Sequence, residues 1–486
     1  MHYLLINTHI RRETFLRNQF HIEHYHELIL GSQTYGKLFE EGLSCFAQYQ
    51  KHFCHFESLT ADRILQFLEK SGIELQKDDQ VVLYDLSCFP LDCDALNLLF
   101  QKCSFSQKWI RFFVNGETAP LLCFSQTHLL DAFSQKPDQN LRLFSPTDEL
   151  RVDATGLVCN IEDSHALLEL FSHNFQVRHF NAIQNKHDGF FLKSSSNKQK
   201  MAEEYAFFQE IPNRLKPYFP QVGAFWEEEG MASYEVEQIY LLDASKLLLN
   251  RIFAKPEKLQ GFTEKLLRYL QALPTKTVDN ATYAKALKKL TLDKNLERLE
   301  QTRQLPFYEA LNRIAQTEGF ETIDVVFSAI NKAIEPHLEG HDTLAFSHGD
   351  LCFSNILYDP DTGQLKLIDP KGIHAEIDYF RPLIYDIAKL SHSFIGLYDL
   401  MVYDRVQIQL VEPNRFELGF NITPIERQAL KQAFVDLLQH LPFDLATVRL
   451  FEASLFISMI PLHKDNPKRI CAQLIHAIQT YKETVH

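Results

Sequence analysis

One passage of the sequence concentrates side chains whose types and spacing could do chemistry. The segment LAFSHGDLCFSNILYDPDTGQLKLIDPKG places Asp350 on a tight loop after His348 and Gly349, and Asn355 follows five residues later. A turn rich in Asp, Pro and Gly then separates two short apolar runs, and the second run ends in Asp369. If these runs pair as a hairpin, Asp369 returns to the loop, and three oxygen-bearing side chains converge.

Phosphoryl transfer suits this combination because the protein contributes mainly positioning and charge to that reaction. A carboxylate must lie near the attacking hydroxyl, and hard oxygen ligands must fix Mg²⁺ on the nucleotide phosphates. We expect Asp350 to be the catalytic base, and Asn355 and Asp369 to be the metal ligands. We expect His348 to support the loop through hydrogen bonds, because the adjacent Asp350 is better placed to meet a hydroxyl.

The order of these residues points to a family. Asp, four residues, Asn, a hairpin and then Asp is the order of the catalytic and metal-binding loops in the kinase template. HGDLCFSNIL followed by LIDPKG resembles the aminoglycoside phosphotransferase and choline kinase group, which shares the protein-kinase-like fold. With the later segment YDIAKLSHSFIGLYD, the passage looks most like phosphotransferase domains of bacterial capsule and surface-polysaccharide loci. The resemblance covers roughly residues 176–486.

This resemblance implies a nucleotide site upstream of the loop. In the kinase template a strand lysine binds the α- and β-phosphates and pairs with a helix glutamate. Lys193 in FFLKSS and Glu204 in MAEEYAFF have the right type and order, with Glu203 as the alternative partner. The strand SYEVEQI would connect the two lobes, where the family's backbone receives adenine. Glu235 and Glu237 are therefore candidate nucleotide contacts.

The expected activity is that of a small-molecule kinase that uses ATP, with GTP left open, and Mg²⁺. The acceptor would be a hydroxyl of a sugar, amino sugar or amino alcohol that feeds a surface glycan. The turn NKHDG holds only Gly189 where protein kinases have a glycine-rich loop, and Asp-Pro replaces Asp-Phe-Gly, which argues against a protein substrate. Two alternatives stay open: a nucleotide-binding pseudokinase or scaffold, and a bifunctional glycan-pathway transferase with an active N-terminal domain.

The apolar periods place these residues in a two-lobed α+β unit. FQVRHFNAI and FFLKSS have the pattern of two strands joined by a turn, KQKMAEEYAFFQEI has a helical period, and GMASYEVEQIYL has the pattern of another strand. We therefore expect residues 176–242 to form a kinase-like N-lobe. Residues 243–486 should form a helical C-lobe, interrupted only at 344–372 and anchored by Asp386, a family position.

The N-terminal part has a different pattern. HYLLINTH, QVVLYDLSCF and WIRFFVNGETAPLLCF are typical of strands, and they alternate with helical segments ADRILQFLEKSGIEL and DALNLLFQKC. This predicts a Rossmann-like layered α/β domain over residues 1–160. We expect a degenerate nucleotidyltransferase-like domain, because Arg11 and Arg12 follow the first strand without a glycine-rich phosphate loop. Asp85 is interpreted as a cap or turn residue and not as a metal ligand.

Composition limits the remaining possibilities. The 486 residues, 45% of them hydrophobic, are enough for at least two domains. An excess of 63 Asp and Glu over 49 Lys and Arg gives a net charge of −14, which disfavours nucleic-acid partners. No signal-peptide pattern and no apolar run of about 18 residues occurs, so we expect a cytoplasmic protein without membrane insertion. The nine cysteines lack zinc-ligand spacing and are expected to be buried free thiols.

Overall fold

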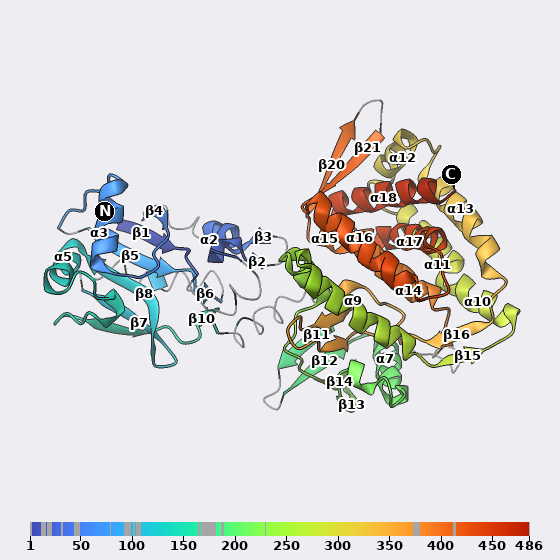
Figure 1. Ribbon diagram of the computed structural model, residues 1–486, viewed down its shortest axis with the longest axis horizontal. Coiled ribbons are helices and arrows are strands. Elements are labelled where there is room, and N and C mark those ends of the chain that lie inside the picture. The colour runs from blue at the N-terminus through green and yellow to red at the C-terminus, as the bar shows by residue number, and fades with distance from the viewer. Residues whose placement is uncertain are drawn as a thin grey trace. The chain divides into compact units, whose positions relative to one another are not determined.

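The computed structural model divides the chain into two compact units, Met1–Phe175 and Gln176–His486 (Figure 1). The structure describes residues 2–10, 16, 22–30, 33–42, 49–77, 79–91, 99–100, 103, 108–163, 167, 181–185, 189–228, 230–372, 380–411 and 415–485. Arg11 and Arg12 lie outside the described residues, as does most of the predicted helix DALNLLFQKC.

Six strands form one mixed sheet in the N-terminal unit. In spatial order they are β4 (Tyr49–Cys54), β1 (His2–Asn7), β5 (Gln80–Asp85), β8 (Glu117–Ser125), β7 (Ile110–Val114) and β9 (Leu150–Asp153). The first three strands are parallel, whereas β8 runs antiparallel to β5 and to β7. The unit combines a sheet with helices, but the Rossmann-like part of the prediction is not confirmed, because a Rossmann sheet is mostly parallel.

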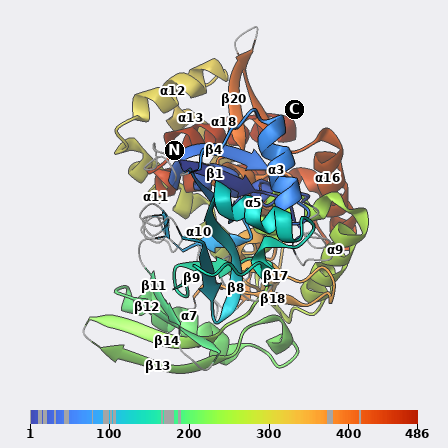
Figure 2. The ribbon, with the colours of Figure 1, turned by 90° about the vertical axis from the view of Figure 1, so that its left-hand side faces the viewer.

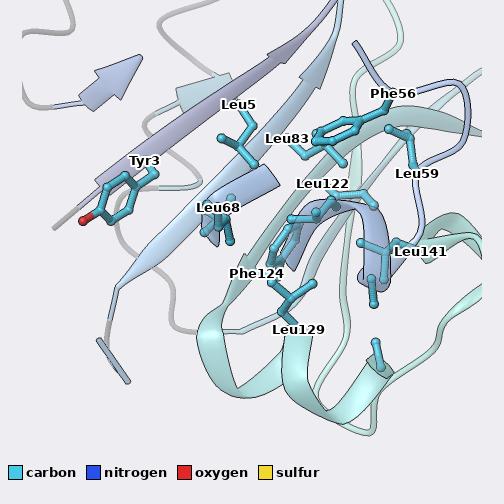
Figure 3. Close-up of a cluster of buried hydrophobic side chains, with 14 of the residues drawn as sticks. Tyr3, Leu5, Phe56, Leu59, Leu68, Leu83, Leu122, Phe124, Leu129 and Leu141 are labelled. Carbon is cyan, nitrogen blue, oxygen red and sulfur yellow. The ribbon is translucent and has the colours of Figure 1, made fainter. Parts of the chain in front are cut away.

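Helices cover both faces of this sheet. They are α2 (Tyr35–Gly42), α3 (Ala61–Lys70) and α5 (Gln126–Gln135). Leu83 and Phe124 belong to the apolar cluster that packs under α3 and α5 (Figure 3). Successive strand residues point to opposite faces, so Tyr84 lies on the other side, 4.8 Å from Phe39 of α2 between ring centroids. Burial from both sides explains why all six residues of β5 are buried.

Several short elements complete this unit. The predicted strand WIRFFVNGETAPLLCF is a hairpin, because Asn115 and Gly116 have φ angles of 51° and 81° that suit a two-residue turn between β7 and β8. Strand β4 was not predicted. The remaining elements are η1 (Tyr25–Glu27), β2 (Ile29–Leu30), β3 (Gln33–Thr34), β6 (Cys88–Pro90), η3 (Leu141–Leu143) and β10 (Val158–Asn160).

A four-stranded antiparallel sheet begins the C-terminal unit. Its strands, in spatial order, are β11 (Asn181–Asn185), β12 (Phe190–Ser195), β14 (Met231–Glu237) and β13 (Val222–Glu228). Helix α7 (Lys198–Glu210) packs on this sheet, with Tyr205 5.7 Å from Tyr234 between ring centroids (Figure 2). The antiparallel pairing predicted for the first two strands is confirmed over β11 and β12, whereas residues 175–180 of the predicted first strand and residues 186–188 of the turn lie outside the described residues. The predicted helix and strand β14 are confirmed, and β13 was not predicted.

The rest of the unit is mainly helical. Its helices are η4 (Lys216–Tyr218), α8 (Ala244–Leu249), η5 (Ile252–Ala254), α9 (Pro256–Gln271), α10 (Asn280–Leu290), α11 (Leu292–Arg303), α12 (Tyr308–Thr317), α13 (Ile323–Ile334), η6 (Glu335–Leu338), η7 (Phe353–Asn355), α14 (Ile384–Phe394), α15 (Tyr398–Val402), α16 (Pro424–Leu438), α17 (Leu445–Met459), η9 (Ile460–His463) and α18 (Pro467–Val485). Its strands are β15 (Thr275–Thr277), β16 (Thr343–Phe346), β17 (Ile356–Tyr358), β18 (Leu365–Leu367), β19 (Phe380–Arg381), β20 (Val406–Val411) and β21 (Arg415–Phe420).

One expectation for this lobe is wrong. Strands β20 and β21 pair as an antiparallel hairpin in a region that was expected to be helical. The sequence VQIQLV alternates apolar and polar residues, which is the period of a strand and not of a helix.

Two expectations about burial can be compared with the structure. The described cysteines are all free, and five of the seven are buried: Cys54, Cys88, Cys103, Cys123 and Cys352. The stretch Leu445–His463 is long and apolar enough to cross a membrane by composition, and 72% of its most apolar window is buried inside the protein, as in a core helix.

The core of the N-terminal unit can be tested with its own fluorophore. The chain has two tryptophans, Trp109 in this core and Trp226 on β13, so a Trp226→Phe background reports on the N-terminal unit alone. In that background Leu83→Ala should lower the free energy of unfolding by about 2–5 kcal/mol, because it leaves a cavity. The matched control Leu143→Ala, where the leucine is 71% exposed, should change it by less than about 0.5 kcal/mol. Equal effects in urea unfolding would contradict this description of the core.

Candidate active site

A hairpin brings the predicted metal ligands together. The loop that carries Asp350 lies between β16 and β17, and β18 returns antiparallel to β17. The amide of Ile368 donates to the carbonyl of Asn355 at 3.0 Å, so Asp369 follows immediately beside the end of the loop. The expectation that the hairpin returns Asp369 to this loop is confirmed.

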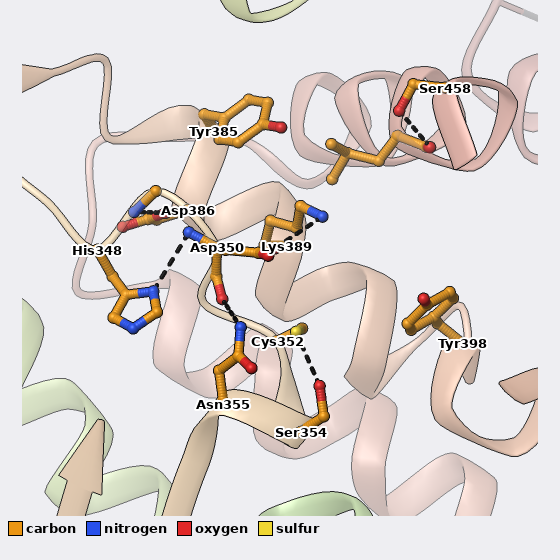
Figure 4. Close-up of polar contacts among 12 residues, drawn as sticks. His348, Asp350, Cys352, Ser354, Asn355, Tyr385, Asp386, Lys389, Tyr398 and Ser458 are labelled. Atoms are coloured by element: carbon orange, nitrogen blue, oxygen red, sulfur yellow. Dashed lines mark hydrogen bonds and ion pairs between the residues drawn. The ribbon is translucent and has the colours of Figure 1, made fainter. Parts of the chain in front are cut away.

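Hydrogen bonds hold the loop in one conformation (Figure 4). His348 Nε2 donates to the carbonyl of Ile368 at 2.9 Å, and its Nδ1 accepts from the amide of Asp350 at 3.2 Å. Asn355 Nδ2 donates to the carbonyl of Asp350 at 2.8 Å. Burial lowers the pKa of His348 to about 4, so the imidazole is neutral at pH 7. These contacts agree with a supporting role for His348.

A close backbone approach requires glycine before Asp350. Gly349 has a φ of 80°, and a Cβ there would lie 2.4 Å from Nη1 of Arg381 and 2.5 Å from Cβ of Lys371. The Arg381 guanidinium donates to four backbone carbonyls, those of Ser347, His348, Lys371 and Gly372. Arg381 therefore joins the segment before Asp350 to the segment after Asp369.

Helix α14 anchors Asp350 directly. Lys389 Nζ lies 2.9 Å from Oδ1 of Asp350, and the lysine side chain is only 7% exposed (Figure 4). Burial alone would lower the pKa of Lys389, but the Asp350 carboxylate raises it well above its ordinary value. Asp386, one turn earlier, accepts from the amide of Gly349 at 2.8 Å, and burial raises its pKa to about 6. Asp386 thus has the structural position expected of it.

Lys389 was missed from the sequence. The signal that could have found it is its spacing, because residues three apart on a helix share a face and Asp386 was already expected to anchor the helical lobe. A lysine on an apolar helix is usually solvated at its tip, so composition gave no indication of an ion pair.

The predicted phosphate-binding pair is present. Lys193 Nζ on β12 pairs with the carboxylate of Glu204 on α7, which also accepts from the hydroxyl of Tyr234 at 2.6 Å. Lys193 also lies 2.6 Å from Oδ1 of Asp369, whose side chain is 58% exposed. Burial would lower the pKa of Lys193, but Asp369 and Glu204 raise it well above its ordinary value.

Glu203, the alternative partner for Lys193, lies against a different part of the chain from Glu204. A Cβ on Gly372 would lie 2.6 Å from Cβ of Glu203, so the chain after Asp369 passes directly over α7. The structure therefore brings Lys193, Glu204 and Asp369 together, and it places Glu203 at the contact between α7 and the segment that follows Asp369.

The two candidate nucleotide contacts, Glu235 and Glu237, lie on strand β14 of the four-stranded sheet. Glu235 Oε2 accepts a long hydrogen bond from the amide of Ala224 at 3.4 Å, and Glu237 Oε2 accepts from the amide of Gln221 at 2.9 Å. The amide of Glu237 donates to the carbonyl of Gln221 at 2.8 Å. These contacts tie β14 to the start of β13, and they use the carboxylates that the sequence suggested as nucleotide contacts.

Asn355 and Asp369 have the donor set that Mg²⁺ prefers. The Asn355 amide nitrogen is used by Asp350, which leaves the side-chain oxygen as the atom suited to a cation. Mg²⁺ usually takes one or two protein oxygens together with waters and phosphates, so two ligands are sufficient. Within the described ranges, no group of three or more His, Cys, Asp or Glu residues could hold a metal ion.

The N-terminal unit has fewer candidate site residues than the C-terminal unit. Asp85 accepts from the amide of Ser87 at 2.9 Å and from Nδ2 of Asn7 at 2.9 Å, which confirms the turn interpretation. Near the carboxyl ends of β1 and β4, His24 lies 4.4 Å from His55 between ring centroids. These two histidines do not belong to a group of three or more potential metal ligands among the described residues.

Three small-molecule kinases are among the solved structures to which this chain is similar. A thermostable mutant of an aminoglycoside phosphotransferase is 9% identical, with 63% of this chain and 94% of that chain covered and a TM-score of 0.37. A glucosamine kinase bound to glucosamine, ADP and inorganic phosphate is 14% identical, with 66% and 83% covered and a TM-score of 0.36. An ethanolamine kinase from Plasmodium vivax is 12% identical, with 67% and 88% covered and a TM-score of 0.36.

No protein-family model and no curated protein matches the chain. Because the identities and TM-scores are low, these three likenesses establish neither the fold nor the activity of this chain.

The buried state of His348 predicts a pH dependence. Its pKa of about 4 in the folded chain lies below the ordinary 6.5, so its contribution to stability is complete above pH 6.5 and is lost as the pH falls towards 4. Between pH 7.5 and 5.0 the wild type should lose about 2 kcal/mol through this group, and His348→Gln should not. The measurement is urea unfolding followed by Trp226 fluorescence in a Trp109→Phe background.

Exposed His440 supplies the control for this experiment. His440→Gln is measured beside it across the same pH range, as the matched loss of an exposed imidazole. If the difference in unfolding free energy between His348→Gln and wild type stayed constant between pH 7.5 and 5.0, His348 would not be held neutral by the fold.

Proposed function

We propose that this protein is a kinase that transfers the γ-phosphoryl group of ATP, with GTP as the alternative donor, to a hydroxyl of a small molecule in the presence of Mg²⁺. The observation that supports this most is the convergence of five residues in one compact unit. Asp350 and Asn355 lie on a rigid loop, and the Lys193–Glu204 pair contacts Asp369 beside it.

Asp350 is the proposed base. Its side chain is 29% exposed, so a hydroxyl can reach it, and Lys389 holds its carboxylate in one orientation. The acceptor oxygen forms a bond to the γ-phosphorus, the bond from that phosphorus to the bridging oxygen breaks, and ADP leaves. The hydroxyl proton passes to Asp350.

Lys193, Asn355 and Asp369 form the proposed nucleotide side. Lys193 would bind the α- and β-phosphates, and Asn355 and Asp369 would hold Mg²⁺, which neutralises phosphate charge when bound. The direct Lys193–Asp369 contact joins two groups that would then bind different parts of the donor. We therefore expect donor binding to separate them.

The acceptor class is proposed from the resemblance of the loop motifs. A sugar, amino sugar or amino alcohol hydroxyl, consumed in the biosynthesis of a surface polysaccharide in the cytoplasm, fits that resemblance. The pseudokinase alternative is less well supported, because Asp350, Asn355 and Asp369 are all present in positions that suit their roles.

The base assignment can be tested by substitution. Asp350→Asn should lower kcat by about 10²–10⁴-fold, because a positioned base contributes about that much. The exposed carboxylate Asp436→Asn is the matched control and should retain full turnover. Asp350→Asn leaves Lys389 buried without its partner, so the double variant Asp350→Asn/Lys389→Met removes that cost and should be folded but inactive. Wild-type turnover in either variant would exclude Asp350 as the base.

The donor site has its own prediction. Mg²⁺ and ATP at about 100 times the dissociation constant should stabilise the wild type by about 2.7 kcal/mol. Asp369→Asn should lose the Mg²⁺-dependent part of this gain, and Asp436→Asn should keep it. Thermal unfolding with ATP in the presence of Mg²⁺ or EDTA measures the difference. If ATP stabilised the protein equally with Mg²⁺ and with EDTA, and equally in wild type and Asp369→Asn, the assignment of Asp369 as a Mg²⁺ ligand would be contradicted.

A further inference from the structure

The hairpin of β20 and β21 has two outer edges, one along each strand. The amide of Asn421 donates to the carbonyl of Arg405 at 3.0 Å, directly beyond the first paired residues of the two strands. Hydrogen-bonded pairs alternate with non-hydrogen-bonded pairs along an antiparallel ladder. Val406, Ile408 and Leu410 therefore belong to non-hydrogen-bonded pairs, and their amides and carbonyls point away from β21.

The outer edge of β21 is covered by side chains of the helical lobe. Phe416 lies opposite Leu410 in the ladder, so its amide and carbonyl also point outward. The amide donates to Oε1 of Glu318 at 3.0 Å, and the carbonyl accepts from Nε2 of Gln479 at 2.8 Å. These contacts agree with the alternation of the ladder, and they tie the edge of β21 to α18 and to the residue that follows α12.

The outer edge of β20 is different. No residue of the described chain forms a hydrogen bond with the outward amides and carbonyls of Ile408 and Leu410. Leu410 is 63% exposed, and the hairpin projects past α18 in both ribbon views (Figure 1, Figure 2). Unpaired amides and carbonyls along a strand edge are a template for pairing with an added strand.

The composition of β20 favours such pairing. Exposed strand edges in natural proteins usually carry charged side chains, Pro or a bulge, each of which prevents the addition of another strand. Strand β20, with the sequence VQIQLV, contains no charged residue and no Pro, and its register with β21 is continuous. By contrast, β21 carries Arg415 and Glu417. Strand β20 therefore has the features of an edge that is paired in solution.

The pattern of β20 is complementary to a second copy of itself. In an antiparallel pair with a two-fold axis at Ile408, this residue lies opposite itself and Val406 lies opposite Leu410. Gln407 lies opposite Gln409 on the other face. The chain as a whole has a net charge of −14, which opposes self-association, whereas the uncharged β20 lets two copies approach. A second copy of this chain is therefore the partner that the strand fits.

We propose that two copies of this chain associate through β20, with a two-fold axis at Ile408, so that the two hairpins form one four-stranded antiparallel sheet. The outward amides and carbonyls of Val406, Ile408 and Leu410 in each copy form the new hydrogen bonds. Six strand residues per copy are fewer than the roughly 20–30 residues a side of a standard interface, so the equilibrium between monomer and dimer depends on concentration. This inference is independent of the proposed kinase function.

The first test is the mass of the full chain in solution. Sedimentation velocity from about 1 to 100 μM covers the range expected for a weak interface. The weight-average mass of the wild type should rise from that of the monomer towards that of the dimer as the concentration increases. A monomer at every concentration would overturn the proposal.

The second test uses the two-fold axis. Ile408→Lys and Ile408→Glu each place like charges opposite one another, so each should raise the dissociation constant of the dimer by about 10- to 100-fold. An equimolar mixture of the two variants should recover the dimer, because a cation then faces an anion, and this recovery also shows that both variants are folded. Ile425→Lys is the matched control on α16, where the isoleucine is 82% exposed, and it should leave association unchanged.

Two results of the second test would overturn the proposal. One is a dimer that persists in both Ile408 variants with the dissociation constant of the wild type, since the interface would then lie elsewhere. The other is a mixture of the two variants that stays monomeric, since residue 408 would then not face itself across the axis.

Discussion

The ion pair between Asp350 and Lys389 constrains the conformation of the loop that carries Asp350. A buried lysine without its carboxylate costs several kcal/mol, so the helix that carries Lys389 and the loop that carries Asp350 must stay together. Asp386 on the same helix adds a second tie through the amide of Gly349. The direction of the Asp350 carboxylate is therefore set by a helix in the core of the lobe. In the proposed reaction, a carboxylate held in this way would need little reorganisation when an acceptor arrives.

The other supports of the site act on the backbone. Arg381 binds four carbonyls on both sides of the site, and His348 joins the amide of Asp350 to the carbonyl of Ile368. Because these two side chains bind main-chain groups, they hold the loop in its conformation. The contact between Gly372 and Glu203 then links the segment after Asp369 to α7, and so to the helix that supplies Glu204.

Local sequence patterns predicted the parts of this site that depend on neighbouring residues. The β17–β18 hairpin and helix α7 follow from short-range periods and turns, whereas Lys193 and Glu204 were assigned through the resemblance to the kinase template. Lys389 and Arg381 could not be assigned from local patterns, because their partners lie on elements distant in sequence. The same limit applies to the N-terminal sheet, where the strands were recognisable but their mixed direction was not.

The central claim is that a phosphoryl group leaves ATP for a small-molecule hydroxyl. The most direct measurement is to incubate the purified protein with Mg²⁺, γ-³²P-labelled ATP and the small-molecule fraction of a cell extract, and to follow the label. The account predicts label in a non-nucleotide phosphate ester that forms only with Mg²⁺ and disappears on phosphatase treatment. Label found only in ATP or inorganic phosphate, at any acceptor concentration, would contradict it.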